Sequence, residues 1–142
     1  ANIYIDKYFN TFKGVKTFLD KTIEDAKTNG YTTTIYNRRR YIPELKSSNN
    51  ALRKFGERTA MNSPIQGSAA DIIKFAMIEV SKLMQGMKSK MIAQVHDELV
   101  FDIYPGELEQ MEEIVRKSME SVISLKVPLV VGISHGKNWL SS

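Results

Sequence analysis

The sequence predicts an α+β fold in which long helices pack on a small antiparallel sheet. Over three long segments, apolar residues recur every three or four positions, the period of a helix that is buried on one side. Two pairs of short segments rich in Ile, Val, Thr and Tyr flank turn-forming residues, which is typical of hairpins. The 142 residues are enough for one domain with a substantial apolar core.

The first third of the chain is predicted to contain a long helix, a hairpin and a loop. The helix runs from Ile3 to about Asn29 and ends at Gly30, because glycine readily adopts the left-handed conformation that terminates helices. Strands at 31–36 and 39–42 then form a hairpin with a strongly basic tip. A polar loop at 46–50 follows.

A second helix is predicted to start near Ala51 and to kink or break between Pro64 and Gly67, because proline removes a helical hydrogen bond. The helix resumes at Ser68, where Asp71 three positions later resembles a capping box. Its continuation presents a wide apolar face and is predicted to be central in the fold.

The last part of the chain is predicted to form a hairpin, a helix and a strand. Two apolar runs, 91–95 and 99–104, are joined by charged residues and form a buried hairpin with charge at its tip. The segment 107–125 has apolar residues along one face and packs as a helix. Residues 128–134 are predicted to close the fold as a buried strand.

The charges are unevenly distributed, although the net charge is only +4. Residues 37–58 contain seven basic and two acidic residues, a local excess of +5. Residues 97–120 contain eight acidic and two basic residues, a balance of −6. A polyanion would therefore favour the first region, and cations would favour the second.

Composition excludes several classes of protein. The sequence has no cysteine, so neither a disulfide framework nor a thiolate zinc site can form. No apolar run approaches the ~18 residues of a membrane span, and we expect no membrane partner. We expect a soluble protein of a reducing compartment, the cytoplasm of a bacterium or alternatively an organelle.

The segment from Val95 to Glu98 is the first candidate for chemistry, because His96, Asp97 and Glu98 interrupt an otherwise apolar hairpin. One interpretation is an exposed turn, where Asp is common. The other is that Asp97 binds a divalent cation such as magnesium, which prefers oxygen ligands. Since adjacent strand residues point to opposite faces, only a distorted tip could direct both carboxylates at one metal.

The second candidate is the set Arg58, Asn62 and Gln66, which would share one helix face if the helix continues through Pro64. All three donate hydrogen bonds, and every base pair offers acceptors in the minor groove, so such a row can contact DNA without reading its sequence. The alternative is a solvated helix face, or local capping by Asn62.

The third candidate is the basic hairpin with Arg38, Arg39, Arg40 and nearby Lys46, which could hold a phosphate backbone. A solvated hairpin tip is the alternative. His135, in a glycine-rich segment near the carboxy terminus, is predicted to be a surface histidine.

Taken together, these segments resemble family A DNA polymerases over about residues 8–139. Val95-His-Asp-Glu98 looks like the third polymerase motif of that family, and the stretch 58–71 is similar to the segment that precedes it. Residues 39–43 with 46–49 resemble the basic hairpin and its loop, and 136–139 resembles the ending of the family. Residues 12–15 and 36–38 depart from the usual pattern.

The resemblance implies a role for each residue of the charged hairpin. Asp97 would be a ligand of a site for two Mg²⁺ ions that aligns a primer 3′ hydroxyl with the α-phosphate of an incoming deoxynucleotide, and the second protein carboxylate would lie outside this sequence. Glu98 would be an accessory carboxylate, and His96 would neighbour the primer terminus.

The resemblance also implies that Arg58, Asn62 and Gln66 contact the minor-groove side of the template-primer. Residues 1–142 would be the carboxy-terminal portion of the polymerase domain, with a helix and basic hairpin in 1–50 and a palm segment with the catalytic hairpin in 51–142. The implied partners are template-primer DNA, deoxynucleoside triphosphates, and the fingers, thumb and upstream palm of the same polymerase.

The family also has a segment with a partner catalytic aspartate and a fingers helix with a lysine that binds the triphosphate, and this sequence lacks both. We therefore predict that these 142 residues are inactive by themselves. Two other hypotheses remain at this point. One is a non-catalytic DNA-binding module, and the other is a metal-dependent phosphodiester hydrolase built on His96, Asp97 and Glu98, with His135 as a further ligand.

Overall fold

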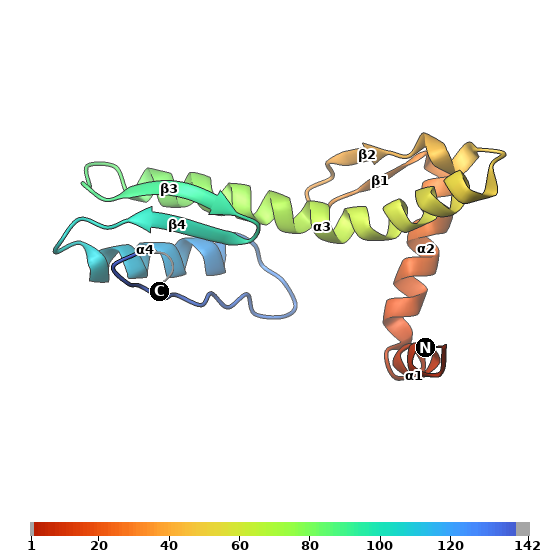
Figure 1. Cartoon of the computed structure of the whole chain (residues 1–142), viewed down its shortest axis with the longest axis horizontal. Coiled ribbons are helices and arrows are strands. Elements are labelled where there is room, and N and C mark those ends of the chain that lie inside the picture. The colour runs from red at the N-terminus through yellow and green to blue at the C-terminus, as the bar shows by residue number, and fades with distance from the viewer. Residues whose placement is uncertain (1, 139–142) are drawn as a thin grey trace. The chain divides into compact units, whose positions relative to one another are not determined.

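The computed structural model describes residues 2–138 and confirms the α+β class (Figure 1). The sheet that was predicted as one is two separate two-stranded antiparallel ribbons within these residues, because each ribbon packs on its own helices. The described residues divide into two units at the boundary between Ser68 and Ala69. Helix α3 (Asn50–Leu83) belongs in part to each unit.

The first unit begins with two helices rather than the single helix predicted. Helix α1 (Asn2–Thr11) and helix α2 (Lys13–Asn29) are separated by Phe12, whose φ of −112° and ψ of 62° are not helical. The apolar period continues across this break, so periodicity could not locate it. Gly14, a weak helix former, lies two residues after Phe12. The end of α2 at Gly30 (φ 80°) is confirmed, and the Gly30 N–H donates to the Ala26 carbonyl.

The basic hairpin is confirmed, with shorter strands than predicted. Strands β1 (Tyr31–Thr33) and β2 (Arg39–Tyr41) pair with Tyr31 opposite Tyr41 and Thr33 opposite Arg39. Residues 34–38 form the connecting turn, in which the Thr34 N–H donates to the Arg38 carbonyl. A short 3-10 helix, η1 (Pro43–Lys46), then takes up the start of the predicted loop.

Helix α3 runs through Pro64 without interruption, so the predicted break and the capping box at Ser68 are wrong. Nearby hydroxyl groups supply hydrogen bonds to helix carbonyls around the proline. Ser63 Oγ donates to the Thr59 carbonyl at 2.6 Å, and Ser68 Oγ donates to the Pro64 carbonyl. The helix therefore continues past the proline, with serine hydroxyls on both sides of Pro64 bonded to its carbonyls.

The core of the first unit joins α2, η1 and α3 through small and branched residues: Ala26, Ile42, Leu45 and Ala60 are all buried. A Cβ at Gly56 would lie 3.0 Å from the Leu45 nitrogen, so a glycine permits α3 to approach η1 closely.

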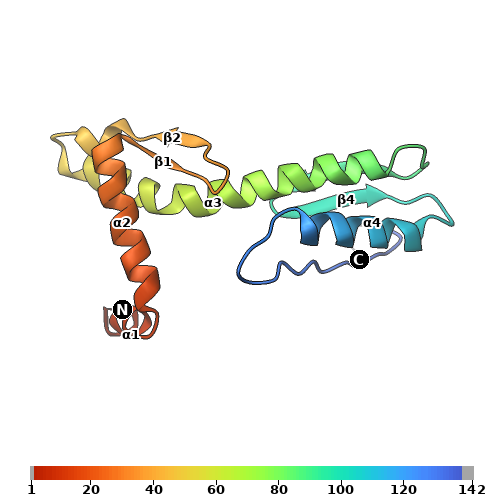
Figure 2. The same ribbon diagram turned by 180° about the vertical axis from the view of Figure 1, so that it is seen from behind.

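In the second unit, the hairpin of β3 (Lys90–Val95) and β4 (Glu98–Asp102) packs with the end of α3 and with α4 (Leu108–Ser121). Figures 1 and 2 show this ribbon beside both helices from opposite sides. The buried cluster is Val80, Met84, Met111 and Val115, with Met91 and Phe101 of the hairpin against it.

The hairpin is less buried than predicted, since only one of its faces meets the helices and Ile92 is 60% exposed. The strand predicted at 128–134 is wrong. Its Val131 bonds to side chains of α4 instead: the Val131 N–H donates to Glu120 Oε1, and its carbonyl accepts from Arg116. None of the helices in residues 2–138 has the length and apolar character needed to cross a bilayer.

Candidate functional site

The tip of the β3–β4 hairpin is a two-residue turn that presents Asp97. Val95 pairs with Glu98, so only His96 and Asp97 lie between the strands. His96 has a φ of 54°, in the left-handed region that non-glycine residues rarely occupy. Gln94 Nε2 donates to the His96 carbonyl at 3.0 Å and stabilises this conformation. The turn therefore presents His96 and Asp97 at its tip, while Glu98 begins strand β4 opposite Val95.

The base of the same hairpin is held by Glu107, which precedes α4. Its carboxylate accepts the Lys88 N–H at 3.1 Å, the Ser89 N–H at 2.8 Å and the Ser89 hydroxyl at 2.6 Å. Ser89 Oγ in turn accepts the Tyr104 N–H at 3.0 Å. The hydroxyl of Ser89, followed by the two backbone N–H groups, lowers the pKa of Glu107 below its usual range.

The three polar side chains at the tip are available to a ligand. His96, Asp97 and Glu98 are exposed, and within residues 2–138 their side chains make no hydrogen bond or ion pair. The charged end of the hairpin is thus separated from the hydrogen bonds that hold its base.

The described part of the chain offers carboxylate chemistry for a cation but no complete set of ligands. Among residues 2–138, no group of three or more His, Asp or Glu side chains could hold a metal ion. A metal-dependent hydrolase acting by itself would need such a group. His135, which lies 3.3 Å from Glu112, is exposed as predicted. The exposed carboxylate of Asp97 is an oxygen ligand of the type that magnesium prefers.

The candidate DNA-contacting residues of α3 were predicted to share one face only if the helix continues through Pro64, and it does. Arg58, Asn62 and Gln66 are four residues apart on an unbroken helix, and all three are exposed. Since each step of four turns the helix by only about 40°, they share one face. Asn62 lies in the helix interior, so its predicted alternative role as a local cap is wrong.

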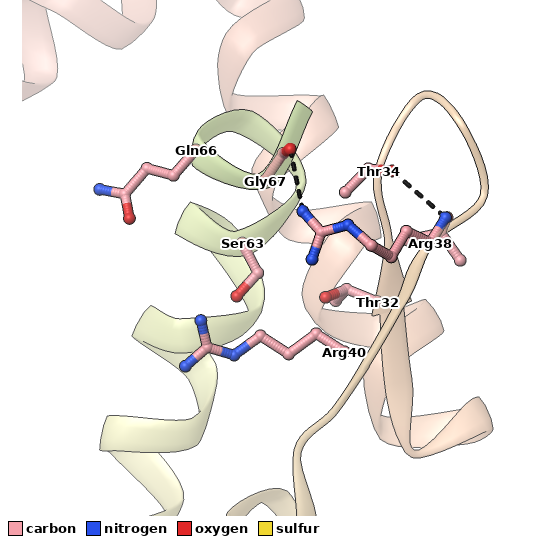
Figure 3. Close-up of a pocket in the computed structure, with 8 residues that line it drawn as sticks. Thr32, Thr34, Arg38, Arg40, Ser63, Gln66 and Gly67 are labelled. Carbon is pink, nitrogen blue, oxygen red and sulfur yellow. Dashed lines mark hydrogen bonds between the residues drawn. The ribbon is translucent and has the colours of Figure 1, made fainter. Parts of the chain in front are cut away.

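The three consecutive arginines of the hairpin do not share one environment. On the face toward α3 lies a pocket lined by Arg38, Arg40, Thr32 to Thr34, Ser63, Gln66 and Gly67 (Figure 3). Arg38 Nη2 donates to the Gly67 carbonyl at 3.1 Å. Figure 3 shows Arg40 reaching toward Ser63, whereas the Gln66 side chain points away from the hairpin. Lys46, at the end of η1, is also exposed.

Arg39 projects from the opposite face of the ribbon. Its guanidinium lies 4.7 Å from the centre of the Tyr31 ring. Hydrogen bonding with Tyr41, followed by the proximity of Tyr31, raises the pKa of Arg39 above its usual value. Strand alternation thus divides the basic run between two faces.

Sequence reasoning missed the residues that fix the two hairpins in place. Ser68 Oγ accepts the Ile35 N–H at 3.0 Å, and a Cβ at Gly67 would lie 2.8 Å from Thr34 Cγ2. Gly67 and Ser68 therefore serve docking of the turn, rather than a helix break. The contacts of Glu107 with Ser89 join positions 18 apart, and no local pattern indicates such a pair.

A family comparison matches residues 1–141 to DNA polymerase family A. The chain belongs to DNA polymerase family A. It is 50% identical over 141 residues to DNA polymerase I of Mycobacterium bovis and 48% identical over 141 residues to DNA polymerase I of Bacillus subtilis. Each match covers 98% of this chain and 16% of the relative.

A solved structure shows the same fold in this family. It is the polymerase domain of Pol1 from M. smegmatis in complex with DNA primer-template and dNTP. The TM-score is 0.95 at 45% identity, covering 97% of this chain and 25% of that chain. The family A chain described above therefore corresponds to a minor part of a polymerase domain in its relatives.

Proposed function

We propose that this family A chain is the carboxy-terminal portion of a DNA-directed DNA polymerase, which extends a primer by nucleotidyl transfer from deoxynucleoside triphosphates in replication or repair. The observation that carries the proposal is the exposed Asp97 on a two-residue turn, with no intramolecular partner among the described residues. The relatives named DNA polymerase I support the same reaction.

In this proposal Asp97 is one protein ligand of a site for two Mg²⁺ ions, and the second carboxylate comes from a part of the polymerase outside this chain. Magnesium is usually held by one or two carboxylates together with substrate phosphates, so a single exposed aspartate fits. When bound, such ions stabilise the attacking and leaving oxygens of an in-line displacement. Glu98 adds negative charge beside Asp97, and His96 lies next to the primer terminus.

The row on α3 is proposed to contact the minor-groove side of the template-primer. Arg58, Asn62 and Gln66 present donors, and purine N3 and pyrimidine O2 are acceptors in every base pair. Their exposure on one continuous helix face supports this role. Such contacts report the shape of the base pair and not its identity.

The basic hairpin is proposed to hold phosphates of the nucleic acid backbone. Arg38 and Arg40 line one pocket, and Lys46 adds positive charge close in sequence. Arginine recognises phosphate through paired N–H groups, while lysine acts as a point charge. These contacts position the nucleic acid and add affinity that weakens with salt.

The chain by itself is proposed to be inactive, because the described residues supply one part of the metal site. Templated primer extension by the rigorously purified 142-residue chain would contradict this part of the proposal. The whole polymerase is consequently the right material for every activity measurement.

The test compares Asp97→Asn with Asp102→Asn in the full-length polymerase. Asp102 is an exposed aspartate on the same hairpin, at the end opposite the tip. We expect Asp97→Asn to lower primer extension by about a thousandfold or more with template-primer binding largely kept, because it removes a metal ligand. Asp102→Asn should extend primers almost like the wild type.

The outcomes of this comparison distinguish a catalytic role of Asp97 from a structural one. If Asp97→Asn extends primers at the wild-type rate, Asp97 is a turn residue and the active-site assignment fails. If the full-length protein binds DNA in a salt-dependent manner but neither it nor any variant extends primers, the chain is part of a non-catalytic DNA-binding module.

A further inference from the structure

The outer face of the β1–β2 ribbon carries two tyrosines and an arginine that pack on one another. Tyr31 and Tyr41 face each other across the strands, with ring centres 5.6 Å apart and planes inclined at 63°. Arg39, two residues before Tyr41 on the same strand face, lies over the Tyr31 ring at 4.7 Å. We call Tyr31, Arg39 and Tyr41 the tyrosine platform.

The platform is open on the described part of the chain. Tyr41 is 67% exposed, although tyrosine is usually buried to an intermediate degree. The opposite face of the ribbon, with Thr32 and Ile42, is buried toward α2 and α3. The ribbon is therefore anchored through one face, while the aromatic rings of the other are left for a further contact.

The charge around the platform selects an anionic ligand. Two residues of the platform, Arg39 and Tyr41, lie within the basic stretch 37–58, which has a local excess of +5. Arg40 and Arg38 are the strand and turn neighbours of Arg39 and are exposed. A flat ring beside the Arg39 guanidinium suits a base and its phosphate, and Arg38 and Arg40 on the other face of the ribbon add positive charge nearby.

We propose that the tyrosine platform stacks an unpaired base of the single-stranded template that extends beyond the primer. A double-stranded segment would not serve, because its bases already stack on one another and present only their edges. An isolated single strand has free base faces, and every base can stack on an aromatic ring whatever its identity. The inference rests on the proposed function, since it needs a template-primer as substrate.

The platform acts in positioning and not in chemistry. A stacked base holds the unpaired template against the hairpin, while Arg39 contacts the adjoining phosphate. Removing one stacking ring lowers single-strand affinity by about fivefold or more, the lower end of what one stacked base contributes.

The test measures binding of the full-length polymerase to two template-primers with the same duplex. One has a single unpaired template nucleotide, and the other has an overhang of about ten, within the roughly 4–16 nucleotides of a stacking site. We expect Tyr41→Ala to weaken binding of the long overhang at least about fivefold and to leave the short one within about twofold. Tyr41→Phe keeps the ring and should bind both like the wild type.

Tyr104→Ala is the matched control, because Tyr104 is an exposed tyrosine with Lys88 over its ring at 4.3 Å but lies in the second unit. The ratio of its affinities for the long and the short overhang should equal that of the wild type. Equal loss on both overhangs for Tyr41→Ala, or no loss on either, overturns the proposal.

A second measurement uses the wild type and is independent of any folding defect. Photo-crosslinking from 5-iodouracil in the template overhang should label the peptide that contains Tyr41. Labelling of that peptide from a displaced strand alone, or from no strand, overturns the proposal. If Asp97→Asn abolishes extension while Tyr41→Ala leaves overhang binding unchanged and the Tyr41 peptide is not crosslinked, only the stacking inference fails. If Asp97→Asn leaves extension intact, the proposed function itself fails.

Discussion

In the two hairpins of this chain, the charged residue that holds the ribbon lies at different ends. In β1–β2, the charges take part in holding the turn: Arg38 donates to the Gly67 carbonyl, and Ser68 accepts the Ile35 N–H. In β3–β4, the Glu107 carboxylate holds the base of the ribbon through hydrogen bonds, and the Asp97 side chain at the tip makes none among the described residues.

The difference shows how each hairpin could bind a ligand. A ligand phosphate at Arg38 would meet a side chain that already has a backbone partner, so binding and local stability are coupled there. A cation at Asp97 would meet a carboxylate that makes no hydrogen bond or ion pair among the described residues. Substitution of Asp97 should therefore change the stability of the fold little.

Gly67→Val should give the largest loss of stability, because it tests the docking of the first hairpin. A Cβ at this position would lie 2.8 Å from Thr34 Cγ2, and the added branch cannot be accommodated without moving the turn. We expect a loss of about 3 kcal/mol, at the upper end for overpacked sites. Faster amide exchange in residues 31–42 of the full-length polymerase would measure it.

The control for that substitution is Gly14→Ala. A Cβ at Gly14 would meet nothing within 4 Å, and alanine favours helices by up to about 1 kcal/mol over glycine. It should leave exchange in residues 31–42 unchanged. Equal protection in Gly67→Val and the wild type would show that the turn is not docked on α3.

Ser89→Ala is expected to have the next largest effect, at the base of the second hairpin. Ser89 is 5% exposed, and its hydroxyl both donates to Glu107 and accepts the Tyr104 N–H. Its loss leaves that N–H without an acceptor, which costs about 1–3 kcal/mol. Thermal unfolding should shift downward, whereas Ser81→Ala on the exposed side of α3 should be nearly neutral.

Glu107→Gln tests the same base through pH. Because hydrogen bonds lower the folded-state pKa of Glu107, its ionised form stabilises the hairpin above the unfolded pKa of about 4.3. That stabilisation is lost as the pH falls through the lower folded-state value. We therefore expect the Lys88 and Ser89 amides to be better protected in the wild type than in Glu107→Gln at pH 7.

Below about pH 4 the difference between the two proteins should shrink. Glu109→Gln is the control, since Glu109 is exposed and its side chain makes no hydrogen bond among residues 2–138. A difference in protection that stays constant from pH 7 to well below pH 4 would show that the carboxylate charge of Glu107 does not stabilise the hairpin.

Lys27→Met should have the smallest effect. Lys27 forms an ion pair with Glu57 at 2.5 Å between α2 and α3, and this pairing lowers the pKa of Glu57. The two side chains are 46% and 29% exposed, so solvent screens the interaction and its loss should cost less than about 1 kcal/mol. A shift in unfolding larger than that of Ser89→Ala would reverse the ranking of the two contacts.

Local sequence signals predicted the ends and turns of this fold better than its long-range packing. Gly30 ends α2, and Asp97 lies at a tight turn, because both follow from rules that act over a few residues. The helix break predicted at Pro64 is wrong, because hydroxyls of α3 and the docked hairpin support the helix around this residue. The segment 128–134 is apolar enough for a strand, but in the described residues it bonds to α4 side chains instead.

The candidate site was predictable as far as single residues go. The motif 95–98 indicated the tip, and the row on α3 followed from a spacing of four. The division of the arginines between two faces depends on where β2 begins, which sequence places only to within a few residues. The network of Glu107 was not predictable, because it joins segments through side-chain to backbone bonds.

The central claim is that Asp97 binds a cation for the polymerase reaction. The most direct test of this claim is to measure Mn²⁺ binding by electron paramagnetic resonance. The material is the full-length polymerase with template-primer and nucleotide, as wild type, Asp97→Asn and Asp102→Asn. We predict at least about tenfold weaker Mn²⁺ binding for Asp97→Asn, the loss expected when an oxygen ligand of a metal is removed, and wild-type binding for Asp102→Asn. Equal Mn²⁺ affinity in all three proteins would contradict the claim.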